Sequence, residues 1–353
     1  MTSNLPCITG IGSVSPYGTL SGAIAPRQLQ PRLITAWPVA GVRRAHLVEP
    51  FRPLDVVPGL KTRRLDRLSV WSLVAASLAI KDSGIDLVQM DRSRVAVVCA
   101  TGLGCIELTE AFFGSAAAHG WYQTDPIIFP ETLGNAPASH VARHLDLRGP
   151  NITVGSKGIA AECALLHAAS LLRNRQADLV LILSGDTLTR TSYEWYETAG
   201  MLSPACFNSE PIMEGSGFIP SEGVTAMLLE PAVSGHRASA FHSYANLRSG
   251  LSASGADPAT VIRKVLNELS PGQGISCIGT AYGVGQTAMA SLREILRENM
   301  TILPPDAIAT GLGDTGALAR LSVALSYAPR GVPILLLGGS AAAGFAALLM
   351  ELP

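Results

Sequence analysis

The sequence predicts an α/β fold built from two similar halves, and three observations lead to that prediction. The chain has 353 residues, of which 48% are hydrophobic and 15% charged, a composition typical of a large compact core. Short apolar runs alternate with segments of helical period, as in layered α/β proteins. A helix, a strand and a small-residue end follow one another twice, at residues 158–186 and 317–340, which indicates an internal duplication.

The first elements are expected to be a strand, a helix and a second strand. A strand is predicted at residues 7–11, before a turn that contains glycine and proline. Residues 19–60 are rich in Pro, Arg and Gly without a sustained period, so we expect a surface excursion there. Apolar residues recur at helical spacing over 67–81, and residues 94–100 are a continuous apolar run. This order predicts a layer of parallel strands.

A central helix is predicted at residues 158–172. Almost no polar residues interrupt this segment, so the helix should be buried on all sides. A central strand is expected to follow at 178–183. The run 223–230 ends at a connector that contains Pro and Gly. The predicted halves are therefore residues 1–231 and 232–353.

Residues 332–350 carry no charge and are nearly long enough to cross a bilayer. The segment is interrupted by Pro333, Gly338, Gly339 and Gly344. We therefore expect two buried strands joined by a small-residue turn, and no membrane insertion. Residues 1–9 lack a basic segment followed by an apolar stretch, so no signal peptide is expected and the cytoplasm is the predicted location.

Composition argues against several other functions. The formal net charge is −1 with no long basic run, which gives no electrostatic basis for binding nucleic acid or anionic membranes. No CxxC pair occurs, so the cysteines are interpreted as small buried residues rather than as disulfide or zinc ligands. The six cysteines are Cys7, Cys99, Cys105, Cys163, Cys206 and Cys277.

Two glycine turns and one histidine pair are candidate binding motifs, but each is incomplete. Residues 10–15 and 101–104 lack the third glycine and the ribose-binding acid of a dinucleotide site, so no nicotinamide cofactor is predicted. His140 and His144 lie four residues apart on a predicted helix without an intervening glutamate. They are interpreted as a surface or partly buried pair, and neither a metal nor a cofactor is expected.

Several segments, in order along nearly the whole chain, resemble the β-ketoacyl-acyl carrier protein synthase family. They include ITGIGSVSPYG at 8–18, RRLDRLSVWSLVAASLAIKDSGI at 63–85, VAVVCATGLG at 95–104, FPETLGNAPASHVARHLDLRGPNITV at 129–154, ADLVLILSGD at 177–186 and GFIPSEGVTAMLLEP at 217–231. IGTAYGVGQT at 278–287 and TGLGDTGALARL at 310–321 match more loosely. The resemblance implies a thiolase fold, with duplicated halves in α-β-α-β-α layers, and a paired dimer.

The family's nucleophilic cysteine begins the central helix, where the helix dipole favours a thiolate. In this chain its position falls on Gly155 or Ser156, so the thiol is missing. Cys163 lies about two turns further along the helix and is interpreted as core. Ser156 remains a candidate acyl acceptor, although it lacks a base to activate it.

The family also uses two histidines in the C-terminal half, whereas this chain has no histidine after His242. The corresponding positions are Ala281 or Tyr282, and Leu312 or Asp314. A tyrosine has a pKa near 10, and a carboxylate would repel a malonyl carboxylate, so condensation is not expected. A hypothesis is that Lys157 and Asp314 pair and plug the vestigial pocket; alternatively, Lys157 faces solvent or a partner.

The resemblance implies a non-catalytic subunit similar to the chain length factor of type II polyketide synthases and of aryl polyene systems. Such a subunit pairs with an active ketosynthase in fatty acid or polyketide assembly, meets acyl carrier protein through the complex, and shapes the acyl tunnel. Predicted tunnel or interface residues are Phe112, Phe113, Trp121 and Phe129. The alternatives are an acyltransferase or thioesterase-like enzyme that uses Ser156, and a homodimeric scaffold.

Overall fold

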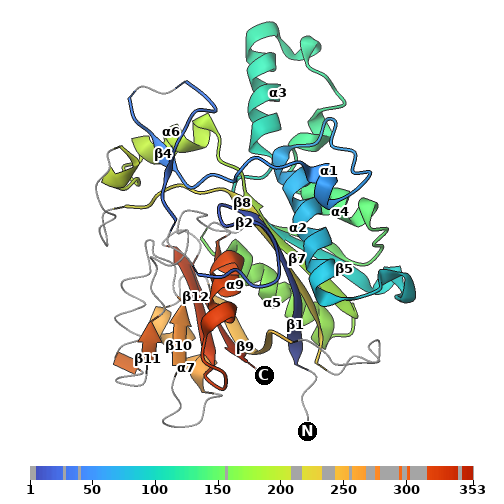
Figure 1. Ribbon diagram of the computed structural model, residues 1–353, viewed down its shortest axis with the longest axis vertical. Helices are drawn as coiled ribbons and strands as arrows, with labels where there is room; N and C mark the ends of the chain where they lie inside the picture. The colour runs from blue at the N-terminus through green and yellow to red at the C-terminus, as the bar shows by residue number, and fades with distance from the viewer. Residues whose placement is uncertain are drawn as a thin grey trace.

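The computed structural model describes most of the chain (Figure 1). The described residues are 5–26, 29–38, 41–155, 158–207, 217–232, 243–253, 257–267, 275–278, 294–295, 300–302, 316–340 and 344–352.

One eleven-stranded sheet runs through the described residues in the order β11-β10-β12-β13-β9-β1-β8-β7-β5-β6, with β2 beside β1. Its first strands along the chain are β1 (Pro6–Ser15), β2 (Gly18–Ser21), β5 (Val95–Ala100), β6 (Asn151–Val154), β7 (Leu179–Asp186) and β8 (Gly223–Pro231). The later strands are β9 (Ala245–Ala253), β10 (Ile275–Ile278), β11 (Met300–Ile302), β12 (Ile334–Ser340) and β13 (Gly344–Glu351).

The two ends of this sheet repeat one plan. β5 is parallel to β6 and β7, and the pairs β7–β8 and β8–β1 are antiparallel. In the same way β10 is parallel to β11 and β12, and the pairs β12–β13 and β13–β9 are antiparallel. β1 and β9 join the two ends where Cys7 faces Asn246. The duplicated halves of the predicted fold class are therefore present, while the boundary at residue 231 remains a prediction.

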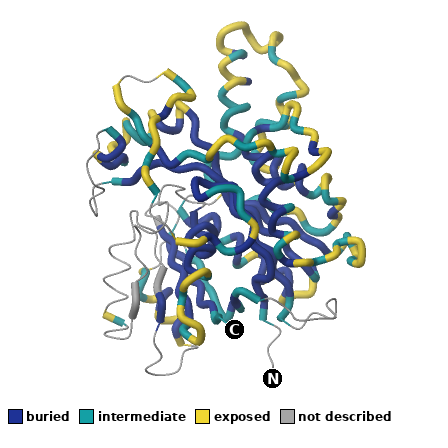
Figure 2. Tube along the Cα trace, in the orientation of Figure 1, coloured by how far each residue is buried: buried dark blue, intermediate teal, exposed yellow. Residues whose placement is uncertain are grey.

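Successive strand residues point to opposite faces of the sheet, so the apolar strands here present two apolar faces. Helices cover both of these faces. α5 (Ala160–Arg173) and α9 (Ala317–Tyr327) share one apolar cluster with strands of both halves. α2 (Arg67–Ser83) and α4 (Ala136–His144) cover the other face of the first half, and α7 (Pro258–Leu266) covers that of the second. Figure 2 shows the buried sheet and inner helices beside exposed outer segments.

α2 illustrates how the sequence sets the helix limits. The Asp66 carboxylate caps the helix by accepting a hydrogen bond from the Leu68 amide at 2.8 Å. Gly84 ends it in the left-handed conformation with φ of 66°. The helix predicted over 67–81 is thus confirmed and is one half-turn longer.

Three predictions about the fold need correction. The sheet is mixed rather than a parallel layer, because only β5, β6 and β7 are parallel in the first half. α5 is not buried on all sides, since His167, Ser170 and Arg173 form an exposed stripe. Residues 19–60 contain regular elements: β2, β3 (Arg32–Leu33), β4 (Arg44–Ala45) and α1 (Pro53–Val56).

The excursion around β3 and β4 has a small apolar cluster of its own. Ile34 and Ala45 pack there with Tyr193 of α6 (Arg190–Thr198) and with Cys206 of η5 (Pro204–Cys206). Apolar residues of this segment lack a clear period because they pack against a loop and a short helix rather than against the sheet.

The uncharged segment 332–350 forms two strands, as predicted. β12 and β13 pair antiparallel from Ile334 opposite Met350 to Ser340 opposite Gly344. Within the described ranges, no helix has both the length and the apolar character to cross a membrane.

The inner helices of the two halves bring opposite charges into the core. Glu162 of α5 is fully buried, and Arg320 of α9 is 4% exposed. Burial lowers the pKa of Arg320, and the nearby Glu162 carboxylate partly offsets that change. A Cβ at position 338 would lie 2.1 Å from a Glu162 carboxylate oxygen, so the Glu162 side chain would have to shift for any residue other than glycine there.

Candidate functional site

The carboxyl ends of β5, β6 and β7 meet at one edge of the sheet, because these strands are parallel and in register. Ala100 pairs with Val154 and with Ser184. The edge therefore brings together the residues that follow the strands, with Gly155 directly after β6. Ligands of open α/β sheets bind at such edges.

Asp186, at the end of β7, is bound by the loop that follows β5. Its carboxylate accepts hydrogen bonds from the Thr101 hydroxyl at 2.6 Å and from the backbone amides of Gly102 at 3.0 Å and Leu103 at 2.8 Å. The Thr101 hydroxyl oxygen in turn accepts one from the Gly104 amide at 2.8 Å. Two backbone donors of the glycine turn at 101–104, the Gly102 and Leu103 amides, are thus satisfied by the chain's own carboxylate, which is 8% exposed.

Gly155 is the predicted vestigial nucleophile position that lies within the described residues. It is exposed, and a Cβ added there would meet nothing closer than the Thr101 carbonyl oxygen at 3.9 Å. The other predicted site residues lie outside the described residues: Ser156, Lys157, Ala281, Tyr282, Leu312 and Asp314. The Lys157–Asp314 plug therefore stays a hypothesis.

The thiols near this edge are not activated. Burial, with a smaller contribution from the Asp186 carboxylate, raises the pKa of Cys99 to about 12. Burial also raises the pKa of Cys105 and that of Cys206. Cys7 is buried and Cys163 is half-buried in α5. A thiolate nucleophile needs a lowered pKa, so Cys99, Cys105 and Cys206 are unsuited to that role.

A second candidate surface is the arm, which we define as residues 106–133. It comprises α3 (Ile106–His119), η3 (Trp121–Gln123) and η4 (Phe129–Thr132), and α3 projects from the body at the top of Figure 1. Its aromatic rings form a chain of contacts: Phe112 to Phe113 at 5.5 Å, Phe112 to Phe129 at 5.7 Å, and Phe113 to Trp121 at 5.9 Å between ring centroids. The four predicted tunnel or interface residues thus form one cluster.

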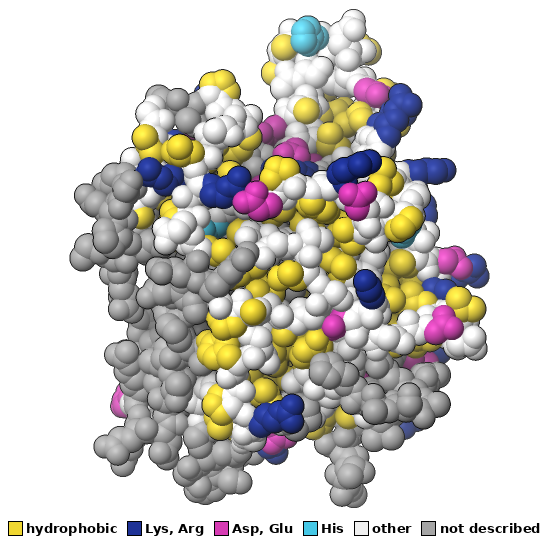
Figure 3. Space-filling model, viewed as in Figure 1, with side chains coloured by type: hydrophobic (Ala, Val, Ile, Leu, Met, Phe, Trp, Pro, Cys, Tyr) yellow, Lys and Arg dark blue, Asp and Glu magenta, His cyan; other side chains and the backbone are white. Residues whose placement is uncertain are grey.

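The aromatic cluster is largely open to solvent. Phe112 is buried, but Phe113 is 47% exposed, Trp121 64% and Phe129 48%. Tyr122, Ile127 and Leu133 of the arm are exposed as well. Figure 3 shows hydrophobic side chains along the arm and around its base. A group of large exposed apolar side chains marks an interaction surface.

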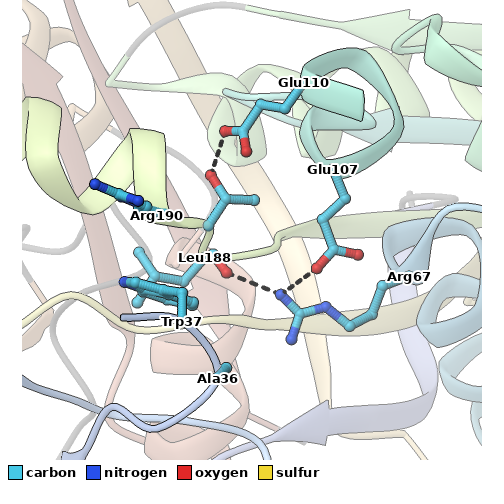
Figure 4. A pocket seen from close by; sticks show the side chains of 8 residues that line it. Ala36, Trp37, Arg67, Glu107, Glu110, Leu188 and Arg190 are labelled. Atoms are coloured by element: carbon cyan, nitrogen blue, oxygen red, sulfur yellow. Dashed lines mark hydrogen bonds and ion pairs between the residues drawn. The ribbon is translucent and has the colours of Figure 1, made fainter. Parts of the chain in front are cut away.

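A pocket of about 310 Å³ lies at the foot of the arm (Figure 4). Arg67 of α2 forms an ion pair with Glu107 of α3 at 2.8 Å and donates a hydrogen bond to the Leu188 carbonyl at 2.8 Å. The Thr189 hydroxyl donates to the Glu110 carboxylate at 2.6 Å. The pocket is lined by Ala36, Trp37, Arg67, Glu107, Glu110, Leu188, Thr189 and Arg190.

Behind the pocket, Arg67 also pairs with the buried Glu222 at 3.1 Å. Burial raises the pKa of Glu222, while Arg67 and the Leu188 and Val48 amides lower it. This charge network was not foreseen from the sequence. No local pattern signals it, because Arg67 and Glu222 are far apart in sequence.

His140 and His144 have different surroundings. His140 is 7% exposed, bonded to the Glu131 carboxylate at 2.5 Å and to Arg143 at 2.8 Å, whereas His144 is exposed. In the part of the chain that the structure describes, no group of three His, Cys, Asp or Glu side chains has a metal-binding arrangement.

Comparisons with known proteins agree on one relationship. A family model described as the N-terminal domain of β-ketoacyl synthase matches residues 42–234. A 3-oxoacyl-[acyl-carrier-protein] synthase 2 of Vibrio harveyi is 23% identical over 246 residues, covering 65% of this chain. The match covers 58% of that relative, so the chain spans less than two thirds of its length.

Two solved structures resemble the whole chain. The ishigamide ketosynthase/chain length factor has a TM-score of 0.77 at 20% identity, with 99% of each chain covered. A type II polyketide synthase acyl-carrier protein in complex with its ketosynthase, bound to the hexaketide, has a TM-score of 0.74 at 15% identity, again over 99% of each chain. At these identities the likeness establishes the fold.

Proposed function

Because the chain belongs to the β-ketoacyl synthase family and has the thiolase fold, we propose that it is a non-catalytic, chain-length-factor-type subunit of a ketosynthase. In this role it pairs with an active β-ketoacyl-acyl carrier protein synthase in fatty acid or polyketide assembly. It meets the acyl carrier protein through the complex and helps to shape the tunnel that holds the growing chain.

The observation that carries the proposal is the residue content of the catalytic positions. Condensation needs a thiolate, and neither Gly155 nor Ser156 supplies a thiol. It also needs groups that stabilise an enolate, yet residues 243–353 contain no histidine. At the same edge of the sheet, Asp186 takes up the donors of the loop after β5.

Two exposed features support pairing with another subunit. The arm presents Phe113, Trp121 and Phe129 to solvent, and buried interface centres are enriched in such side chains. β6 is the last strand in the sheet order, and its residues Ile152–Val154 are half-buried. Sheet edges are commonly protected by pairing or cover. A partner subunit that contacts both the arm and β6 would bury the aromatic cluster and cover the edge of the sheet.

Tunnel shaping would use the same cluster. Phe112, Phe113, Trp121 and Phe129 are large enough to form a wall or a steric stop for an acyl chain, and their contacts keep them in one group.

We further propose that Lys157 and Asp314 close the vestigial pocket as an ion pair. A double-mutant cycle with alanine at both positions tests this pair, and additive losses of stability would count against it.

The test is co-expression with an active ketosynthase, followed by chain-extension assays with acyl and malonyl thioesters of acyl carrier protein. We expect a stable complex that extends the chain, and no extension by the purified chain alone. Replacing the partner's nucleophile should abolish all extension. Extension by this chain without a partner would overturn the proposal.

A covalent-labelling experiment separates this function from an acyltransferase that uses Ser156. The purified chain is incubated with a labelled acyl thioester beside its Ser156→Ala variant. No label is expected on either protein. Label on the parent that is lost in the variant would instead support the enzyme.

A further inference from the structure

The arm is held to the body by little apolar packing. Among the residues of α3, only Phe112 and Ala116 are buried. The helix therefore lacks the broad apolar stripe by which most helices are fixed to a core. Its direction must be set largely by polar contacts at its foot, since hydrogen bonds and ion pairs are directional and dispersion contacts are not.

Three carboxylates of the arm bond to three different parts of the body. Glu107 pairs with Arg67 of α2 at 2.8 Å. Glu110 accepts a hydrogen bond from Thr189, the N-cap of α6, at 2.6 Å. Glu131 of η4 bonds to His140 of α4 at 2.5 Å. The arm is thus tied to α2, α4 and the start of α6, and three separate attachments define an orientation where one would leave a hinge.

The hydrogen-bonding roles at His140 follow from its neighbours. Arg143 can only donate, so the Nδ1 atom of His140, 2.8 Å from the guanidinium, must accept. The remaining proton then lies on Nε2 and is donated to Glu131. The histidine is therefore oriented by the body toward the arm, and a glutamine at position 140 would not reproduce both bonds.

The chain also supports the foot of the arm through its backbone. The Asp66 carboxylate, which caps α2, accepts a second hydrogen bond from the Leu108 amide at 3.1 Å. The Thr109 hydroxyl donates to the Thr132 carbonyl at 3.1 Å, which joins the outgoing and returning parts of the arm. These two bonds fix the first turn of α3 and join the two parts of the arm. The direction of α3 relative to the body still depends on the three side-chain attachments.

We infer that the pairs Glu107–Arg67, Glu110–Thr189 and Glu131–His140, here called the collar, position the arm for pairing with the partner subunit. This inference rests on the proposed function, because the partner is the ketosynthase subunit proposed above. The collar residues touch no reacting group. They act through the aromatic cluster, by presenting Phe113 and Trp121 in one orientation before the partner arrives.

A distance measurement tests positioning without any partner. Spin labels are attached to cysteines introduced at Lys81 on α2 and Ala118 on α3, both exposed, in a background that carries Cys163→Ala. As a control, the Cys163→Ala protein without the two introduced cysteines must take up no spin label. We expect one narrow distance distribution in the parent and a broad one in the double variant Glu110→Ala, Glu131→Ala, which removes both acceptors. An unchanged distribution would overturn the positioning role.

A pairing measurement tests the consequence. The same double variant should bind the ketosynthase at least about tenfold more weakly than the parent, while still unfolding in one cooperative thermal transition. Glu194→Ala is the matched control, since Glu194 forms an exposed ion pair with Arg190 at 2.6 Å outside the arm, and it should not change the affinity. A broadened distribution with unchanged affinity would overturn the link between arm orientation and pairing.

The two failures can be told apart. If alanine variants of the aromatic cluster also leave pairing unchanged, the arm is not the pairing surface and the proposed use of the arm fails. If those variants weaken pairing while the collar variants do not, only the collar inference fails. Alanine replacements are chosen because each removes the acceptor oxygen, whereas glutamine would keep a carbonyl oxygen that can accept the same bond.

Discussion

The edge of the sheet beyond β5, β6 and β7 and the arm that rises beside it have opposite properties. At the edge, Asp186 is bound by three donors of the neighbouring loop and is largely buried. On the arm, Phe113 and Trp121 are about half or more exposed, and they contact mainly each other. The Asp186 carboxylate is satisfied by its own loop where chemistry would be expected, and apolar side chains lack cover where a partner would bind.

This difference separates two ways in which a fold can serve a function. A catalytic edge needs polar groups that are free to meet a substrate, and such groups cost stability when they are buried unpaired. A subunit whose function is shape can satisfy those groups internally and keep an apolar surface for assembly. The function proposed above corresponds to the second description, and the following predictions test each side of it.

The largest effect is expected from filling the packed part of the edge. In Gly185→Ala the new Cβ would lie 2.2 Å from the Gly223 carbonyl oxygen, a backbone atom that cannot move without disrupting the β7–β8 pairing. We expect a loss of about 3 kcal/mol or more in the free energy of unfolding. Urea denaturation measures it.

The control lies on the same edge. Gly155→Ala places its Cβ 3.9 Å from the nearest atom and should change the free energy of unfolding by less than about 0.5 kcal/mol. Equal losses at the two positions would show that the edge is not divided into a packed part and an open one.

The second effect concerns the internal satisfaction of the edge. Asp186→Ala leaves the Thr101 hydroxyl and the Gly102 and Leu103 amides without their acceptor, so we expect a loss of about 3 kcal/mol. Asp186→Asn keeps one carbonyl oxygen as an acceptor and should lose roughly half as much. Thermal and urea unfolding of both variants check the order, and a neutral alanine variant would contradict it.

The third prediction concerns the other side of the comparison. The double variant Phe113→Ala, Trp121→Ala should weaken binding to the ketosynthase by about 30-fold or more, which corresponds to about 2 kcal/mol. Its own stability should change little, because both side chains are largely exposed. Trp195→Ala on α6 is the matched control, since Trp195 is 59% exposed and lies outside the arm. Isothermal titration calorimetry gives the dissociation constants.

The smallest effect is a pH dependence at the foot of the arm. Burial raises the pKa of Asp66 and of Glu222 in the folded protein. The folded state then binds protons more readily than the unfolded chain, so the contribution of these groups to stability increases as the pH falls through their folded pKa values. It levels off below the unfolded values, near pH 4.

The measurement is a difference between two proteins. As the pH falls toward about 4, the parent should gain stability relative to Glu222→Gln, because the variant lacks one of the groups whose pKa burial raises. Urea unfolding at several pH values gives the two slopes. A parent that loses stability relative to the variant over this range would show that the sign is wrong.

The sequence predicted the elements whose signals are local. The helical period over 67–81, the apolar run of β5 and the interrupted segment that forms β12 and β13 were all recognised. Strand direction was not, because an apolar run looks the same in parallel and antiparallel pairs. The exposed stripe of α5 was missed since its apolar residues outnumber the three polar ones that face solvent.

In the candidate site, too, the sequence indicated some features and missed others. The absent thiol and histidines could be read directly, and the aromatic residues of the arm could be named because few large rings occur in this composition. The collar could not be foreseen. Glu110 and Thr189 are 79 positions apart, and only the folded sheet brings them together. Contacts of this kind depend on tertiary geometry and leave no periodic signal.

The arm leaves and returns to the body at one point. A Cβ on Gly104 would come within 3.3 Å of the Gly134 Cα, so the chain just before the arm touches the chain just after it. A segment whose ends meet can be cut out and bridged by a few residues without pulling on the sheet beneath. If the arm is the pairing surface proposed above, exchanging it between related subunits should change which partner binds and leave the sheet beneath intact.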